Sequence, residues 1–167
     1  MVLAAGQTEP VHTYAVTVTW TGNLGDGTRS YRGYRRDHTV EADGRPAIPA
    51  SSDPVFRGDP ARWNPEQLLV AAVSQCHMLW YLHLCADAGV VVLEYRDEAS
   101  GSCRIDRDGS GEFTEVTLRP QVVVEDPATT DRALALHADV GALCQIARSV
   151  AFPVRHEPSV TPAPPSP

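Results

Sequence analysis

The sequence predicts an α+β fold with antiparallel sheets and two main helices. Alternating apolar and polar residues indicate strands near both ends of the chain and in its middle, whereas a long apolar stretch after Asn64 indicates a buried helix. A second helical pattern begins after Pro127. The resulting order, which is strands, helix, two strands, helix and strand, is typical of the α+β class.

Three strands are expected before the first helix. Residues 11–20 alternate strictly, with Tyr, Val and Trp on one face and Thr and Ala on the other. A second strand is expected over 29–40. A hairpin signal at Asp43-Gly44 then predicts a short returning strand at 45–50. Residues 51–63 contain three Pro or Gly residues and are expected to form a loop.

The first helix is predicted from Asn64 to about Ala88. Asn64 can cap it, Pro65 suits its first turn, and Glu66 suits the positive end of the helix dipole. Gly89 is the expected stop. The segment is apolar on nearly every face, so it is expected to be buried on most sides.

The sequence after the first helix predicts two strands, a second helix and a last strand. The strands are expected at 90–105 and 112–125, joined by a turn rich in Gly and Asp. A second helix is predicted from about Ala128 to Arg148, and a strand over 152–160. The proline-rich tail at 161–167 is expected to be disordered.

Length and composition predict one domain, at 11–160, with a flexible N-terminal segment at 1–10. The net charge of -7 argues against nucleic-acid binding. All 14 basic residues are arginine, which leaves no lysine for Schiff-base or P-loop chemistry. No membrane-spanning segment or signal peptide is expected, and four cysteines without an export signal favour the cytoplasm.

Two cysteines, Cys76 and Cys144, each lie within a predicted helix and have no CxxC partner. A reactive thiol with a distant second thiol is the arrangement of thiol peroxidases. One ionised sulfur attacks the peroxide, and the second captures the resulting sulfenic acid. The alternative is that both are small core residues. Cys85 and Cys103 are interpreted as structural, because Cys85 is half a turn out of phase with Cys76.

The sequence around the first cysteine resembles the OsmC/Ohr family of thiol peroxidases. The run Asn64-Pro65-Glu66-Gln67-Leu68-Leu69, followed by Ser74-Gln75-Cys76-His77-Met78, is similar to the family's NPE(E/Q)L…C element. Cys144 lies at the distance of the family's second cysteine. Many relatives have a proline directly after that cysteine, where this chain has Gln145.

The resemblance implies an intertwined homodimer with its active sites at the subunit interface, and reduction of organic hydroperoxides or hydrogen peroxide. Cys76 would be the nucleophile and Cys144 the resolving thiol. Arg57 is the best match to the family's active-site arginine, and Arg29 is the alternative. Glu66 would hold that arginine. On a straight helix Glu66 lies about 15 Å from Cys76, so either the chain bends or Glu66 serves the other subunit.

No cofactor is expected, since the two cysteine sulfurs carry the electrons. A dithiol donor, such as a lipoylated protein or a thioredoxin, would reduce the disulfide back to two thiols. Metal binding is not expected, because His77 and His83 diverge from the cysteines beside them. Two other functions stay open. One is a stress-associated binding dimer without turnover. The other is a general thiol–disulfide oxidoreductase.

Overall fold

The computed structural model describes residues 11–164, and it divides into two units, residues 1–65 and 66–167. The predicted flexible segment at 1–10 and the end of the predicted tail at 165–167 lie outside the described residues.

The first unit contains a three-stranded antiparallel sheet in the order β1 (Thr17–Trp20), β2 (His38–Glu41) and β3 (Ile48–Ala50). A 3-10 turn, η1 (Pro54–Phe56), follows within the predicted loop. The strands are shorter than predicted, because only the last four residues of 11–20 pair with a neighbour.

The prediction of a strand over 29–40 is wrong for residues 29–37, which form a loop held by side chains. The Arg36 guanidinium lies 4.2 Å from the ring centroids of both Tyr31 and Tyr34. It also donates hydrogen bonds to the carbonyl oxygens of these two residues, at 2.8 and 2.7 Å. Two backbone hydrogen bonds, from Thr21 to Asp37 and from Arg35 to Gly22, also hold the loop at 2.9 Å. The sequence pattern could not reveal these contacts between residues that are not regularly spaced.

The second unit begins with α1 (Pro65–Asp87), whose bounds confirm the predicted helix to within a residue or two. Gly89 follows with a φ of 71°, the left-handed conformation that ends many helices. Four side chains at a spacing of four residues are buried on α1, namely Val73, His77, Tyr81 and Cys85. This ridge is the side of the helix that packs against the strands.

By length and composition alone, α1 could also cross a membrane. The core helix of a water-soluble protein meets the same criteria. Polar side chains from other elements meet this helix along its length, including His137 and Gln145. We therefore describe α1 as the core helix of the second unit.

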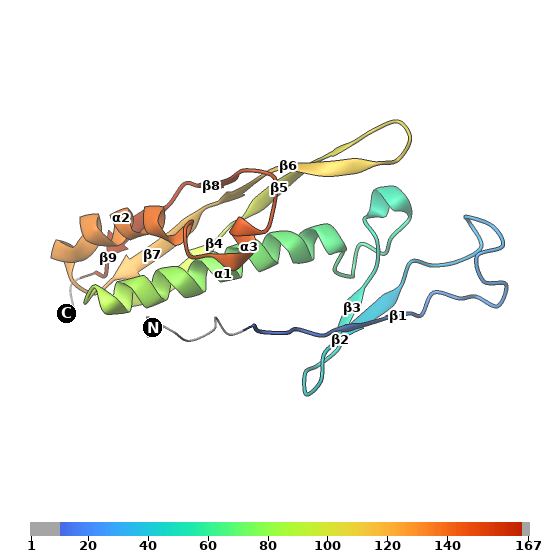
Figure 1. The fold of residues 1–167 in the computed structure, drawn as a ribbon, viewed down its shortest axis with the longest axis horizontal. Helices are drawn as coiled ribbons and strands as arrows, with labels where there is room; N and C mark the ends of the chain where they lie inside the picture. Colours follow the sequence, from blue (N-terminus) through green and yellow to red (C-terminus); the bar gives the residue numbers. More distant parts are fainter. Residues whose placement is uncertain (1–10, 165–167) are drawn as a thin grey trace. The chain divides into compact units, whose positions relative to one another are not determined.

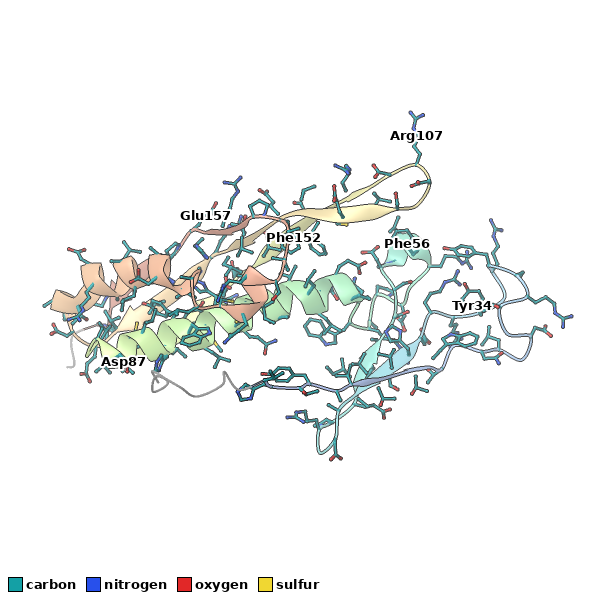
Figure 2. The ribbon with its side chains drawn as sticks, viewed as in Figure 1. Tyr34, Phe56, Asp87, Arg107, Phe152 and Glu157 are labelled. Carbon is teal, nitrogen blue, oxygen red and sulfur yellow. The ribbon has the colours of Figure 1, made fainter. Side chains whose placement is uncertain are left out.

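The two strands predicted at 90–105 and 112–125 form one long hairpin in which each strand is interrupted once. Its outer half pairs β5 (Ser100–Ile105) with β6 (Gly111–Leu118), and its inner half pairs β4 (Val92–Asp97) with β7 (Pro120–Val124). At the interruption the Arg119 amide donates to the Asp97 carboxylate at 2.6 Å. Arg107 points outward from the tip of this hairpin (Figure 2).

The predicted last strand is also divided in two, and its parts pair in parallel with the hairpin. β8 (Val154–His156) pairs with β6, and β9 (Ser159–Pro162) pairs with β7. The predicted antiparallel pairs are present in this unit, and the parallel pairing of β8 and β9 makes its sheets mixed. β9 extends to Pro162 and so includes the first two residues of the tail that was predicted to be disordered.

The prediction of one helix from Ala128 to Arg148 is wrong, because the segment breaks before Cys144. A 3-10 turn, η2 (Pro127–Thr129), leads into α2 (Thr130–Val140), and α3 (Gln145–Arg148) is a separate short helix. The amides of Leu143 and Cys144 both donate to the carbonyl of Val140 at 2.9 Å. Gly141 opens this turn, and glycine is a poor helix former.

The core of the second unit lies between α1 and the strands, and Figure 1 shows α1 running along them. Tyr81 and Cys85 pack with Val122 and Val124 of β7 and with Ala133 and Val140 of α2. Near the start of α1, the helix lies close to β5. A Cβ on Gly101 of β5 would lie 2.8 Å from the side chains of Val70 and Phe113. Glycine is required there by the packing of the helix on the strand.

A buried histidine pair crosses this core. His77 Nε2 of α1 and His137 Nδ1 of α2 are 2.9 Å apart, and each residue is 2% exposed. The ring of His137 stacks on Tyr81 at a centroid distance of 3.8 Å, and His156 lies against His77 at 4.7 Å. Burial, reinforced by neighbouring histidines, lowers the pKa of His77 to about 3 and that of His137 to about 4. Both rings are therefore neutral at pH 7.

We predict that acid destabilises the protein through this pair. Both histidines have a folded pKa below their unfolded value of 6.5, so the unfolded state binds more protons as the pH falls. The stabilisation is complete above pH 6.5 and is lost progressively toward pH 3. Between pH 7 and pH 5 we expect a loss of roughly 2 kcal/mol per histidine. Urea denaturation at a series of pH values measures it.

The matched variants are His137→Gln and His83→Gln. His83 is exposed on α1, the helix that also carries His77, so its variant should keep the full pH dependence. The His137 variant should have a shallower dependence, whatever its stability at pH 7. Equal slopes in the two variants would show that the buried pair does not cause the acid sensitivity.

Candidate active site

The structure brings Cys76 and Cys144 into contact, although 68 residues separate them. Their Sγ atoms lie 2.7 Å apart, with both residues as free cysteines. Cys76 is half-buried in the middle of α1, and Cys144 is buried in the turn between α2 and α3. Little movement of either backbone is needed to join the two sulfurs.

Cys144 occupies the N-cap position of α3. Its backbone is extended, with φ of −70° and ψ of 105°, and its sulfur accepts a hydrogen bond from the Ala147 amide at 3.4 Å. The break in the predicted second helix therefore places this sulfur over α1. Burial, together with the hydrogen bond to Cys76, raises the pKa of the Cys144 thiol to about 11. Cys144 is thus a neutral thiol at pH 7.

Two further residues, Gln145 and Trp80, complete the surroundings of Cys76. Trp80 Nε1 donates to Gln145 Oε1 at 3.0 Å, and the same oxygen lies 3.9 Å from Cys76 Sγ. Cys76 and Trp80 are one helical turn apart and share a face of α1. The sequence placed Trp80 among the candidate walls of a substrate pocket, but it did not predict the contact between Trp80 and Gln145. The spacing of Cys76 and Trp80 was the only available signal, because contact with Gln145 depends on the turn before α3.

Glu66 lies in the first turn of α1, as predicted. The helix continues without interruption to Cys76, so the two residues are separated by about 15 Å along its axis. The structure therefore does not bring Glu66 to the Cys76 of the same helix. Its Oε2 atom is buried and has no hydrogen-bond partner among the described residues. A shielded carboxylate oxygen of this kind favours a cationic partner.

The two candidate arginines belong to the first unit. Arg57 follows η1, is exposed and has a φ of 68°, a left-handed conformation that is uncommon for residues other than glycine. Arg29 is exposed in the loop between β1 and β2. The position of either arginine relative to Cys76 stays a prediction.

The other two cysteines lie apart from this site. Cys85 is 1% exposed in the core beside Tyr81, and burial raises the pKa of its thiol. Cys103 is exposed on β5. Over residues 11–164, no group of three or more His, Cys, Asp or Glu side chains has the arrangement of a metal site.

The family model for OsmC-like proteins matches residues 58–159, which include both cysteines of the site. This chain belongs to the OsmC family. The matched segment covers α1, the long hairpin and the turn that carries Cys144. Comparison with functionally curated proteins gives no match.

Solved structures of OsmC-family proteins have the same fold. An OsmC-like protein of unknown function from Vibrio cholerae is 33% identical, with a TM-score of 0.79 over 89% of this chain and 99% of that one. An organic hydroperoxide resistance protein from Elizabethkingia anophelis is 16% identical, with a TM-score of 0.65 over 93% and 100% of the two chains. Another, from Legionella pneumophila, is also 16% identical, with a TM-score of 0.63 over 92% and 99%.

We predict that a mild thiol oxidant such as diamide joins Cys76 to Cys144 within one chain. The two sulfurs are already in contact, whereas Cys85 is enclosed in the core and Cys103 is isolated on a strand. Peptide mapping under non-reducing conditions should recover this single linkage. Iodoacetamide should label Cys103 readily before and after oxidation, which serves as the internal control. A disulfide involving Cys85 would contradict the described core.

Proposed function

We propose that this OsmC-family protein is a thiol peroxidase that reduces organic hydroperoxides, with hydrogen peroxide as a further substrate. The contact between the sulfurs of Cys76 and Cys144 is the observation that carries the proposal. The names of the Elizabethkingia and Legionella relatives, both organic hydroperoxide resistance proteins, agree with it. A binding protein without turnover has no need for a half-buried thiol next to a second thiol.

In the first step the Cys76 thiolate attacks the terminal oxygen of the peroxide. The O–O bond breaks, the alkoxide leaves and takes up a proton to become an alcohol, and Cys76 becomes a sulfenic acid. Sulfur loses two electrons, and the peroxide gains them. Cys76 suits this role better than Cys144, because Cys76 is half-buried, whereas Cys144 is buried and burial raises the pKa of its thiol.

In the second step Cys144 attacks the sulfur of the Cys76 sulfenic acid. A disulfide forms, and the displaced hydroxide leaves as water with the proton from Cys144. The short distance between the sulfurs means that this step needs no unfolding of α1. An external dithiol, such as a lipoylated protein or a thioredoxin, then reduces the disulfide and restores both thiols. No bound cofactor takes part in these steps.

We further propose that the protein works as a homodimer in which Glu66 serves the Cys76 of the other subunit. The unbroken helix separates Glu66 from the Cys76 of its own chain, and its buried Oε2 has no partner among the described residues. An arginine held by Glu66 would stabilise the thiolate and hydrogen-bond the peroxide. Arg57 is our first candidate for that arginine, and Arg29 is the second.

The roles of the two sulfurs predict different failures of two variants. Cys76→Ser should abolish reduction of cumene hydroperoxide even in a single turnover, since the nucleophile is absent. Cys144→Ser should complete one turnover and then accumulate Cys76 sulfenic and sulfinic acid, because no disulfide can form. Mass spectrometry of peroxide-treated protein distinguishes them. Cys85→Ser and Cys103→Ser are the controls, and oxidation of either cysteine while Cys76 stays reduced would disprove the assignment.

A complementation experiment tests the dimer and the role of Glu66 together. Cys76→Ser and Glu66→Gln chains should each have little activity. When they are co-expressed and assemble at random, half of the dimers are mixed. Each mixed dimer then has one intact site if Glu66 acts across subunits, and activity should recover to about a quarter of the wild-type value.

No recovery would mean that Glu66 acts within its own chain, whereas full activity of the Glu66→Gln protein alone would mean that Glu66 has no role. A folded monomer at micromolar concentration in sedimentation would contradict the dimer itself. Arg57→Ala and Arg29→Ala, measured in the same assay, identify the arginine. The active-site arginine is the one whose replacement slows the oxidation of Cys76 by the peroxide while the protein stays folded.

A further inference from the structure

Gln145 lies between the reactive sulfur and the indole of Trp80. Its Oε1 atom accepts from Trp80 Nε1 at 3.0 Å and is 3.9 Å from Cys76 Sγ. The backbone of Gln145 is also fixed, since it begins α3 directly after the capping Cys144 and its carbonyl accepts from Ser149 at 2.8 Å. The hydrogen bond from Trp80 and the fixed backbone at the start of α3 therefore together hold the Gln145 side chain beside Cys76.

Trp80 determines which end of the Gln145 amide faces the sulfur. An indole N–H can only donate, so it selects the amide oxygen and excludes the amide NH₂ group. The same oxygen is the atom that lies near Cys76. Cys76 consequently faces a hydrogen-bond acceptor of fixed orientation.

The gap between this acceptor and Cys76 matches one added hydroxyl group. A sulfur–oxygen bond of about 1.7 Å, followed by an O–H···O hydrogen bond of about 2.8 Å and a bend of about 115° at the oxygen, spans about 3.8 Å. The observed distance from Cys76 Sγ to Gln145 Oε1 is 3.9 Å. A sulfenic acid formed on Cys76 can thus donate its proton to Gln145 without moving either side chain.

Building on the proposed peroxidase function, we propose that Gln145 holds the Cys76 sulfenic acid in its protonated form and so limits over-oxidation. Trp80 acts through Gln145 as a positioning residue. An acceptor beside an O–H group stabilises the neutral acid relative to its anion. Two competing reactions of Cys76 depend on that balance.

The protonated sulfenic acid is the form whose sulfur Cys144 attacks, giving the disulfide and water. The sulfenate anion instead attacks a second peroxide molecule. It gains one oxygen to become a sulfinate, and the peroxide is reduced to an alcohol. Cys144 is buried, and burial disfavours the thiolate that has to attack. The sulfenic acid therefore has to persist until this thiol ionises. An acceptor at Gln145 favours the disulfide during this interval.

The test compares Gln145→Leu, Gln145→Glu and the control Gln75→Leu in the full chain. Gln75 precedes Cys76 and is exposed, so its variant should behave as wild type. Each protein is treated with several equivalents of cumene hydroperoxide from pH 5 to pH 9, and intact-mass spectrometry gives the ratio of sulfinate to disulfide. Gln145→Leu should raise this ratio roughly fivefold at pH 7, the effect of one neutral hydrogen bond.

Gln145→Leu should also shift the pH at which sulfinate appears to a lower value, because the sulfenic acid loses its acceptor. Gln145→Glu keeps an acceptor for both Trp80 and the hydroxyl, so it should restore the wild-type ratio, although its charge should slow the first step. A lost packing contact would not produce this rescue. Trp80→Phe, which frees the amide without removing it, should shift the ratio in the same direction by a smaller factor.

The inference is overturned if Gln145→Leu and Trp80→Phe both form disulfide and sulfinate in the wild-type ratio with an unchanged pH profile. It is also overturned if Gln145→Glu behaves as Gln145→Leu does. Failure of the proposed function has a different signature, since Cys76 of the wild-type protein would then not be oxidised by the hydroperoxide at all. Disulfide formation with diamide in each variant verifies that the two cysteines still meet.

Discussion

The packing of one ridge of α1 against the strands is the constraint on which the second unit depends. Val73, His77, Tyr81 and Cys85 are buried at a spacing of four residues, which fixes the rotation of the helix about its axis. Once that rotation is fixed, the adjacent ridge carrying Cys76 and Trp80 has to face the turn before α3. The position of the reactive sulfur is therefore a consequence of core packing that does not itself involve the sulfur.

The same core contains the polar pair of His77 and His137, which makes the stability of the fold depend on pH. His77 and His137 satisfy one another across the interface of α1 and α2, yet His137 Nε2 has no partner among the described residues. A larger aliphatic pair would be less sensitive to acid. The contact between the two histidines, however, fixes where α2 lies along the axis of α1. α2 leads directly into the turn that carries Cys144. Buried polar pairs can specify register in this way.

Several features of the fold were predictable because they depend on local chemistry. The bounds of α1 followed from Pro65 and Gly89, and the hairpin turn near Arg107 followed from its Gly and Asp residues. Other features were not predictable, because they depend on distant partners. The segment at 29–37 was predicted as part of a strand, but it forms a loop in which the Arg36 guanidinium lies against two tyrosine rings. The parallel pairing of β8 and β9 with the hairpin leaves no local signal.

The sequence by itself determined the family motif, the helix that carries Cys76 and the identity of the two cysteines, since each depends on residue types at short spacing. Only the tertiary structure decided that the sulfurs touch and that Gln145, which accepts a hydrogen bond from Trp80, lies beside Cys76. A continuous helical pattern through Cys144 concealed the break after Gly141, because propensity is summed over many residues, whereas a turn is decided by a few hydrogen bonds. That break brings a residue 68 positions away onto α1, and no periodicity in the sequence records it.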